Sequence, residues 1–170
     1  MESSALNTTE NAQFTQLTIL GFVAYAFVYF VTAFSQGKIR QRIFNADFMS
    51  QFNAEHQAAF GSDAPKGGYP DDGNGYYSQK LSYADWYIFN NWQRAHMNFL
   101  ETFTAVAVMT LITAINQPLW GLISIWTLVV GRIFYGFGYC QKGPGGRLLG
   151  ALITDIALLA VMIGGFVSVF

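Results

Sequence analysis

The sequence predicts an all-α integral membrane protein folded as a four-helix antiparallel bundle. Of its 170 residues, 52% are hydrophobic and only 11% are charged, whereas water-soluble domains carry about 25% charged residues. Four apolar segments approach the ~20 residues of helix that cross a ~30 Å hydrocarbon layer. All nine Lys and Arg residues also fall on one side of such a four-span arrangement. Together these features favour a multi-pass bundle over a soluble domain.

The first predicted span is Leu17–Phe34, which carries no charge. Residues 1–16 contain two acids and no base, a composition that fits neither a secretory signal nor an Arg-rich transit peptide. We therefore expect residues 1–16 to form a polar N-terminal tail. Residues 17–170 are expected to form a single four-span membrane domain with an extended loop at about 35–87.

Within this extended loop, residues 45–60 have aromatic residues at near-helical spacing and predict a surface helix. Residues 61–80 contain five glycines and two prolines, which predict irregular structure because glycine and proline disfavour regular elements. The run DDGNG at 71–75 raises the question of a calcium site. It lacks the ligand spacing and final glutamate of an EF-hand loop, so a plain turn is the preferred interpretation.

The second span, about Phe99–Ile115, continues a helical pattern that begins at Trp86. This helix would be about 45 Å long at 1.5 Å per residue, so its first turns should lie among headgroups or in a protein-lined cavity. A tight turn at 116–118 leads to the third span, Leu119 to about Cys140. The fourth span, Leu148–Phe170, carries Asp155 as its one charged residue.

The basic residues predict the orientation of the bundle. They follow the first span, open the second, or lie between the last part of the third span and the start of the fourth. By the positive-inside rule this end faces the cytoplasm or the mitochondrial matrix, and both termini lie opposite. The membrane is expected to be that of the endoplasmic reticulum or the mitochondrion.

Other kinds of site find little support in the composition. A single cysteine excludes an internal disulfide and a cysteine-based metal cluster, and the two histidines have no paired spacing. We therefore expect no metal site. The net charge of −1 gives no indication of a nucleic-acid partner.

Two polar stripes interrupt the apolar spans. Arg94, Asn98 and Glu101 lie on one face of the second helix because they are four and three residues apart. On the third span Arg132, Tyr135 and Tyr139 repeat this spacing, and Arg147 opens the fourth. Charged groups in a bilayer face protein, water or ligand. The stripes either pair with each other or bind a ligand; the excess of donors over the one carboxylate favours a ligand that carries carboxylates.

Two stretches carry a family resemblance: IFNNWQRAHMNFLE at 88–101 and VVGRIFYGFGYCQKGPGGRLLGAL at 129–152. They resemble the MAPEG superfamily, the membrane-associated proteins of eicosanoid and glutathione metabolism, and are most similar to its type 3 microsomal glutathione transferases. The resemblance weakens toward the first span and residues 38–44. It implies homotrimers of four-helix protomers that bind glutathione between neighbours.

The resemblance also implies roles for individual residues. Arg147 resembles the catalytic arginine beside the glutathione sulfur. The implied glutathione-binding residues are Lys38, Arg40, Arg94, Asn98, Glu101, Arg132, Tyr135 and Tyr139. A cation such as Arg147 beside the glutathione sulfur would favour the reactive thiolate over the thiol. His96 lies off the Arg94 face and is interpreted as a packing or hydrogen-bonding residue. Asp155 lies outside the family pattern and either pairs with Arg147 or faces a partner protein.

Two functions from different classes remain open. The first is a glutathione-dependent membrane transferase or peroxidase that acts on lipophilic electrophiles or lipid hydroperoxides. The second is a structural subunit that keeps the bundle within a larger membrane complex, such as a respiratory-chain assembly, with little or no catalysis. The long loop and Asp155 motivate the second. A channel or transporter is disfavoured because the polar stripes occupy only one side.

Overall fold

Four long helices make up most of the chain. The structure is a computed structural model that describes residues 2–167, with side chains from residue 9 onward. The long helices are α1 (Glu2–Ile43), α4 (Tyr83–Asn116), α5 (Pro118–Lys142) and α6 (Leu148–Val167), and the described residues contain no strand. All four are long and apolar enough to cross a membrane. The predicted all-α, four-span membrane bundle is therefore confirmed.

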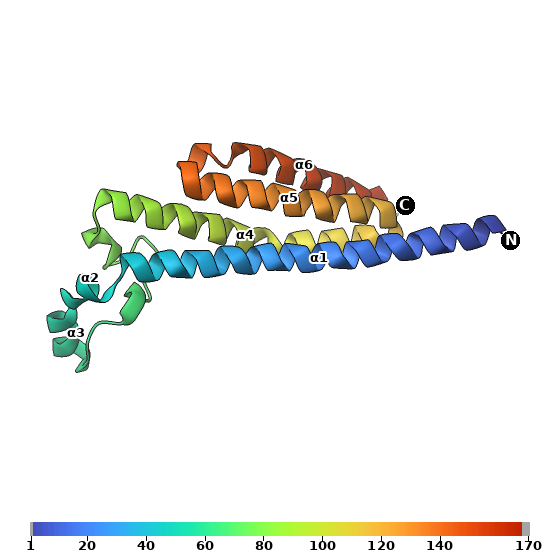
Figure 1. Ribbon diagram of the computed structural model, residues 1–170. Helices are drawn as coiled ribbons and strands as arrows, with labels where there is room; N and C mark the ends of the chain where they lie inside the picture. Colours follow the sequence, from blue (N-terminus) through green and yellow to red (C-terminus); the bar gives the residue numbers. More distant parts are fainter. Residues whose placement is uncertain (1, 168–170) are drawn as a thin grey trace.

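The helices run up and down in sequence order, so that both termini lie at one end of the bundle (Figure 1). The opposite end is called the basic end here because it carries Lys38, Arg42, Lys142 and Arg147. Helix α5 packs against each of the other three long helices. Residues 168–170, the last part of the predicted fourth span, lie outside the described residues.

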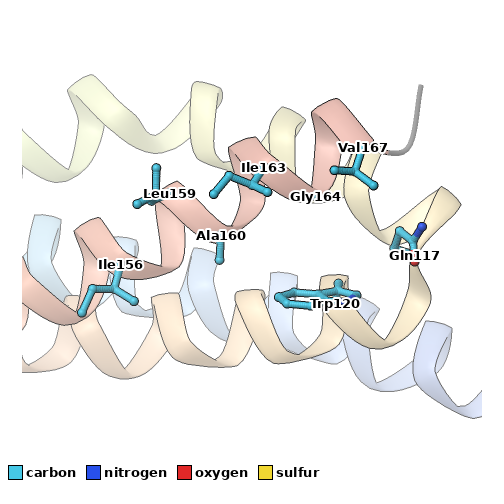
Figure 2. Close-up of a pocket in the computed structure, with 8 residues that line it drawn as sticks. All are labelled: Gln117, Trp120, Ile156, Leu159, Ala160, Ile163, Gly164 and Val167. Carbon is cyan, nitrogen blue, oxygen red and sulfur yellow. The ribbon is translucent and has the colours of Figure 1, made fainter. Parts of the chain in front are cut away.

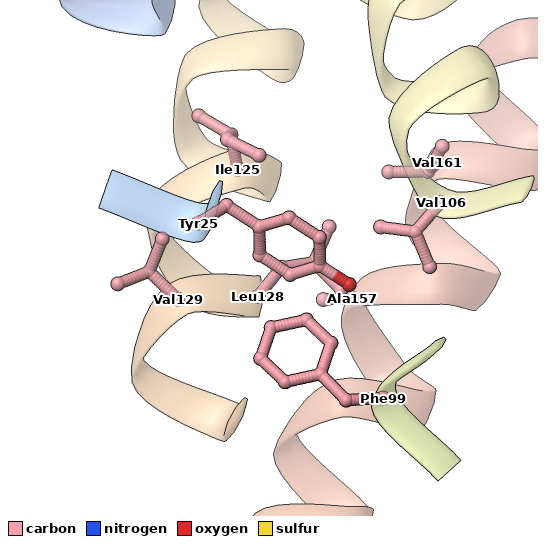
Figure 3. Packing of buried hydrophobic residues seen from close by; sticks show 8 residues of the cluster. All are labelled: Tyr25, Phe99, Val106, Ile125, Leu128, Val129, Ala157 and Val161. Carbon is pink, nitrogen blue, oxygen red and sulfur yellow. The ribbon is translucent and has the colours of Figure 1, made fainter. Parts of the chain in front are cut away.

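All four helices contribute to one buried apolar cluster (Figure 3). Tyr25 comes from α1, Phe99 and Val106 from α4, and the other members from α5 and α6: Ile125, Leu128, Val129, Ala157 and Val161. The Tyr25 and Phe99 rings meet edge to face with centroids 5.0 Å apart. Since lipid tails are as apolar as these side chains, close packing and interhelical hydrogen bonds hold the helices together.

Helices α5 and α6 pack backbone against backbone through glycine. A Cβ atom at Gly150 would collide with the backbone of Tyr135, and Gly138 and Gly146 exclude a Cβ from each other in the same way. Small residues permit such close approach between membrane helices. The consequence is that the first turn of α6 is held directly over the last turns of α5.

The first helix differs from its prediction at both ends. It begins at Glu2 and ends at Ile43, so no break separates the predicted polar tail from the predicted span that starts at Leu17. Near its end, Gln36 Nε2 donates to Gln93 Oε1 of α4 at 2.5 Å. This contact helps explain why the helix continues beyond the apolar stretch.

The connection between α1 and α4 is correspondingly shorter than the predicted loop at 35–87. It covers residues 44–82, because the Ser82 hydroxyl caps α4 by accepting from the Asp85 N–H at 3.1 Å. The predicted surface helix at 45–60 occurs as two short helices, α2 (Ala46–Ser50) and α3 (Asn53–Phe60). Two 3₁₀ turns follow, η1 (Lys66–Gly68) and η2 (Ser78–Lys80).

The connection has its own buried cluster, which includes Phe44, Phe52 and Phe89. Arg40 is also buried, with 4% of its surface exposed. Its guanidinium donates to the carbonyl oxygens of Gly67, at 3.3 Å, and Asp71, at 2.6 Å, and lies 4.4 Å from the centroid of the Tyr69 ring. Arg40 therefore fastens the connection to the end of α1.

The run DDGNG forms a turn around the Asp71 carboxylate, which accepts from the N–H groups of Gly73, Gly75 and Ser78 at 2.8, 3.0 and 2.7 Å. Burial alone would raise the pKa of Asp71. The N–H donors of Ser78, Gly73 and Gly75 outweigh burial and hold this pKa below its usual value.

Acid should loosen this turn. Because the pKa of Asp71 is lowered by folding, the ionised carboxylate stabilises the turn above the unfolded value of about 3.9. This stabilisation is lost as the pH falls through the lower, folded pKa. Amide hydrogen exchange of Gly73, Gly75 and Ser78, corrected for intrinsic rates, should show protection falling in that range. Asp71→Asn should flatten the pH dependence and Asp72→Asn, at an exposed neighbour, should leave it unchanged.

The glycine contact between α5 and α6 can be tested with one methyl group. Gly150→Ala should destabilise the bundle by about 1–3 kcal/mol, the usual cost of overpacking, and should lower the thermal unfolding midpoint in detergent. Gly136→Ala is the matched control, since a Cβ there meets no atom within 4 Å. Equal midpoints for the two variants would contradict the proposed close packing.

Candidate functional site

A polar pocket of about 270 Å³ lies between α4, α5 and α6 at the basic end. It is unusual for a membrane bundle because most of its lining side chains are polar or charged: Asn98, Thr102, Arg132, Tyr135, Arg147, Thr154 and Asp155. Toward this end α4 extends beyond the ends of α5 and α6 (Figure 1). The pocket therefore lies near the end of α5 and the start of α6, beside the projecting part of α4.

Arg132 is the buried cation of this pocket, with only 3% of its surface exposed. Its Nη1 donates to Asn98 Oδ1 at 2.9 Å, and its Nη2 donates to the Thr102 hydroxyl. Both partners are neutral. The Nε of Arg132 is buried without a hydrogen-bond partner among the described residues. The Phe99 ring, 4.9 Å away from the guanidinium carbon, gives some cation–π stabilisation.

Arg147 lies at the start of α6, where its carbonyl accepts the helical hydrogen bond from Ala151 at 2.8 Å. Its Nη1 donates to the Tyr135 hydroxyl at 3.4 Å, and its guanidinium lies 5.4 Å from the Tyr139 ring centroid. The close approach of Gly150 to Tyr135 brings α6 into this position. A helix N-terminus adds positive potential, so Arg147 and α6 together favour a bound anion.

The structure brings together five of the residues singled out from the sequence. Asn98, Arg132, Tyr135 and Arg147 line the pocket, and Tyr139 packs against Tyr135 with ring centroids 5.8 Å apart. The two stripes face each other, because Arg132 of α5 reaches across to Asn98 of α4.

The other four predicted residues do not line this pocket in the protomer. Lys38, Arg94 and Glu101 are exposed on α1 and α4. Arg40 donates to carbonyl oxygens of the 44–82 connection, as described above, so it is left out of the binding residues proposed below. Arg40 cannot be distinguished from Lys38 by sequence alone, because the carbonyl groups that surround Arg40 come from residues far along the chain.

Sequence reasoning missed Thr102 and Thr154. Thr102 lies four residues after Asn98 and so on the same face of α4, which is a signal that could have identified it. Asp155 lines the same pocket as Arg147. His96 packs beside the Tyr29 ring with centroids 5.4 Å apart, in keeping with the packing role predicted for it.

A second groove, of about 410 Å³, lies between α5 and α6 at the end opposite the basic end. Gln117 and Trp120 line it on one side and Ile156, Leu159 and Ile163 on the other (Figure 2). It contains no charged side chain and no nucleophile among its lining residues. The chemistry that this protomer can offer is therefore concentrated at the basic end.

The fold and the pocket define a multi-pass membrane protein with a cationic pocket near one end of its helix bundle. A sequence model of the MAPEG family matches residues 18–167. The chain therefore belongs to the MAPEG family, which comprises membrane proteins of glutathione and eicosanoid metabolism. No solved structure matches the chain significantly.

The contact between Arg132 and α4 can be tested at Thr102. Thr102→Val keeps the shape of the side chain and removes the acceptor for Nη2, so it should destabilise the bundle by about 1–3 kcal/mol, the cost of leaving a buried donor unmet. Thr104→Val, at an exposed position two residues along α4, is the control. Thermal unfolding in detergent would measure both. A Thr102→Val midpoint equal to that of the control would refute the role given to this hydrogen bond.

Proposed function

We propose that this protein is a glutathione-dependent membrane transferase or peroxidase that acts on lipophilic electrophiles or lipid hydroperoxides. Glutathione is the co-substrate in this proposal and supplies a thiolate nucleophile. The proposed catalytic residue is Arg147. The proposed binding residues are Lys38, Arg94, Asn98, Glu101, Arg132, Tyr135 and Tyr139.

The observation that carries the proposal is the charge balance around Arg132. Arg132 is buried in the bundle, and both of its hydrogen-bond partners, Asn98 and Thr102, are neutral. A charge in this environment is costly in a membrane. Leaving a buried charge unpaired costs several kcal/mol. An anionic ligand would supply the missing partner, and glutathione carries two carboxylates in addition to its thiol. Glutathione therefore matches the pocket in charge, and its carboxylates can accept hydrogen bonds from the arginine side chains.

Arg147 is suited to hold the sulfur as a thiolate. A free thiol has a pKa near 8.5 and is mostly protonated at neutral pH. A cation beside the sulfur favours the thiolate, and each unit by which the thiol pKa falls corresponds to about 1.4 kcal/mol. Tyr135, which accepts from Arg147 at 3.4 Å, and the Tyr139 ring hold the guanidinium in the pocket.

The proposal includes completion of the site by neighbouring copies, as in a homotrimer. The protomer pocket of about 270 Å³ is just below the ~300–1,000 Å³ typical of ligand sites, so it is small for a tripeptide. Arg94 and Glu101 are exposed on the outer face of α4, where a neighbour would bury them. Both features support a site shared between protomers.

The alternative is a structural subunit of a larger membrane complex, and one observation that motivates it is the long loop. In this structure that loop is the 44–82 connection between α1 and α4. The contacts of Arg40 and Asp71 and the buried aromatic cluster account for its order within this chain. The alternative remains testable by whether the protein binds glutathione on its own.

The direct test is glutathione turnover by the purified protein with a hydrophobic electrophile and with a lipid hydroperoxide. Thiolate formation should appear as ultraviolet absorbance when the protein and glutathione are mixed. Arg147→Ala should remove the thiolate signal and lower turnover about ten-fold or more, as expected for a shift of one pKa unit or more. Arg94→Ala should weaken glutathione binding. Lys142→Ala, a nearby exposed base outside the pocket, is the control.

Turnover that is insensitive to both Arg147→Ala and Arg94→Ala would refute the site assignment. Absence of glutathione binding, together with migration of the native protein only within a large complex, would favour the structural subunit.

A further inference from the structure

The connection between α1 and α4 contains a small pocket of its own, of about 210 Å³. Helix α3, which supplies most of its lining, lies at the basic end, outside the four long helices (Figure 1). We call it the aromatic pocket, and its lining residues are Phe52, Glu55, His56, Ala59, Phe60, Tyr76 and Tyr77. Its volume is below the ~300–1,000 Å³ of sites for drug-sized ligands, so it suits one small chemical group.

Helix α3 and the Asp71 turn fix the two sides of the aromatic pocket. The lining residues of α3 follow Phe52, its N-cap, at spacings of three, four, seven and eight, so they share one helix face. Tyr76 and Tyr77 belong to the turn around the Asp71 carboxylate, which accepts from the N–H groups on either side of them at 3.0 and 2.7 Å. Both sides are therefore held by regular hydrogen bonding within the connection.

Three aromatic rings of the pocket meet at steep angles. The Phe52 and Tyr77 rings have centroids 4.8 Å apart and are inclined by 65°. The Tyr76 ring is inclined by 60° to Phe52 and by 73° to Tyr77, with centroids 5.9 and 6.2 Å away. Rings inclined in this way turn their π faces in different directions. Because each face is the negative side of the ring, such a group of rings attracts a cation.

Packing of the connection alone does not account for these rings. Phe52 is 4% exposed and belongs to the buried cluster of the connection, but Tyr76 and Phe60 are 57% and 76% exposed. Exposed apolar side chains that gather at one place on a surface indicate a binding site. The buried ring thus supports the fold, and the exposed rings are available to a ligand.

Glu55 gives the aromatic pocket a negative charge. Its carboxylate oxygens accept from the Tyr76 hydroxyl at 3.1 and 2.9 Å, and no lysine or arginine is among the lining residues. His56 donates through Nδ1 to the Ser62 carbonyl oxygen at 2.9 Å, which in the neutral ring leaves Nε2 as an acceptor. The pocket therefore combines π faces with a carboxylate, and both favour a cation.

We infer that the aromatic pocket binds the trimethylammonium group of a choline compound. A primary ammonium or a guanidinium group carries several N–H donors that need acceptors, whereas the carboxylate of this pocket is already bonded to Tyr76. A trimethylammonium group has a positive charge, apolar methyl groups and no N–H donor. Aromatic rings are the surfaces on which proteins recognise such cations.

The choline compound has two possible sources with the same chemistry, a soluble choline ester and the headgroup of phosphatidylcholine. The inference is independent of the proposed function, because the aromatic pocket shares no lining residue with the polar pocket.

Binding can be measured with choline on the purified full-length protein in a maltoside detergent. Saturation-transfer NMR of the choline methyl signal would give the Kd. The neutral isostere dimethylbutanol, in which carbon replaces the nitrogen, is the matched ligand control. Choline should bind saturably, and dimethylbutanol should bind about five-fold more weakly or worse because it lacks the charge that the rings and Glu55 attract.

Four variants test the two attractions separately. Tyr76→Leu should raise the Kd of choline about two- to five-fold by removing one ring, whereas Tyr76→Phe should retain binding. Tyr83→Leu, at an exposed aromatic residue outside the pocket, is the control. Glu55→Gln keeps an acceptor for Tyr76, removes the charge and should raise the Kd about five-fold. Its control is Asp47→Asn, at an exposed acid of the same connection.

The source of the group can be identified in nanodiscs of phosphatidylglycerol. If the headgroup of phosphatidylcholine is the ligand, adding this lipid to the discs should raise the apparent Kd of choline, and phosphatidylethanolamine should not. An unchanged Kd with both lipids would identify a soluble choline compound.

Equal binding of choline and dimethylbutanol would overturn the inference, as would choline binding that never saturates. The same holds if Tyr76→Leu and Glu55→Gln bind choline as tightly as their controls do. The side chains of Tyr76 and Glu55 are exposed, and equal thermal unfolding midpoints would show that each variant is folded. None of these outcomes bears on glutathione turnover, by which the proposed function is judged.

Discussion

The structure depends on one buried arginine that must be accommodated inside a bundle that crosses a membrane. Arg132 reaches from α5 to Asn98 and Thr102 of α4, and no carboxylate of the described residues accepts a hydrogen bond from it. Hydrogen bonds to neutral groups lower the cost of such a charge only in part. The remaining cost explains why polar residues of three helices gather at this level, and it makes an anionic ligand a chemically natural occupant.

Two buried arginines are accommodated in different ways. The Arg40 guanidinium is enclosed by backbone carbonyls and aromatic rings, which tie residues 44–82 to the end of α1. Arg132 lines the polar pocket, and its Nε has no hydrogen-bond partner among the residues that the structure describes. Arg147 is held in a third way, since the glycine contact between α5 and α6 places its helix N-terminus over Tyr135 and Tyr139.

In the proposed function the two reactants would come from different directions. Glutathione, a water-soluble anion, would reach the polar pocket from the basic end, where Arg147 and the first turn of α6 lie. A lipophilic co-substrate would reach it from the bilayer.

The sequence by itself determined the four-span bundle, because hydrophobic length and the placement of basic residues are local properties of the chain. It also determined which side chains share a helix face, and with the family resemblance it predicted Asn98, Arg132, Tyr135 and Arg147 as site residues, which line one pocket in the structure. Only the tertiary structure separated Arg40 from Lys38, joined Thr102 to Arg132 and placed Asp155 in the pocket. These outcomes depend on contacts between helices and loops distant in sequence, and helical periodicity contains no information about such contacts.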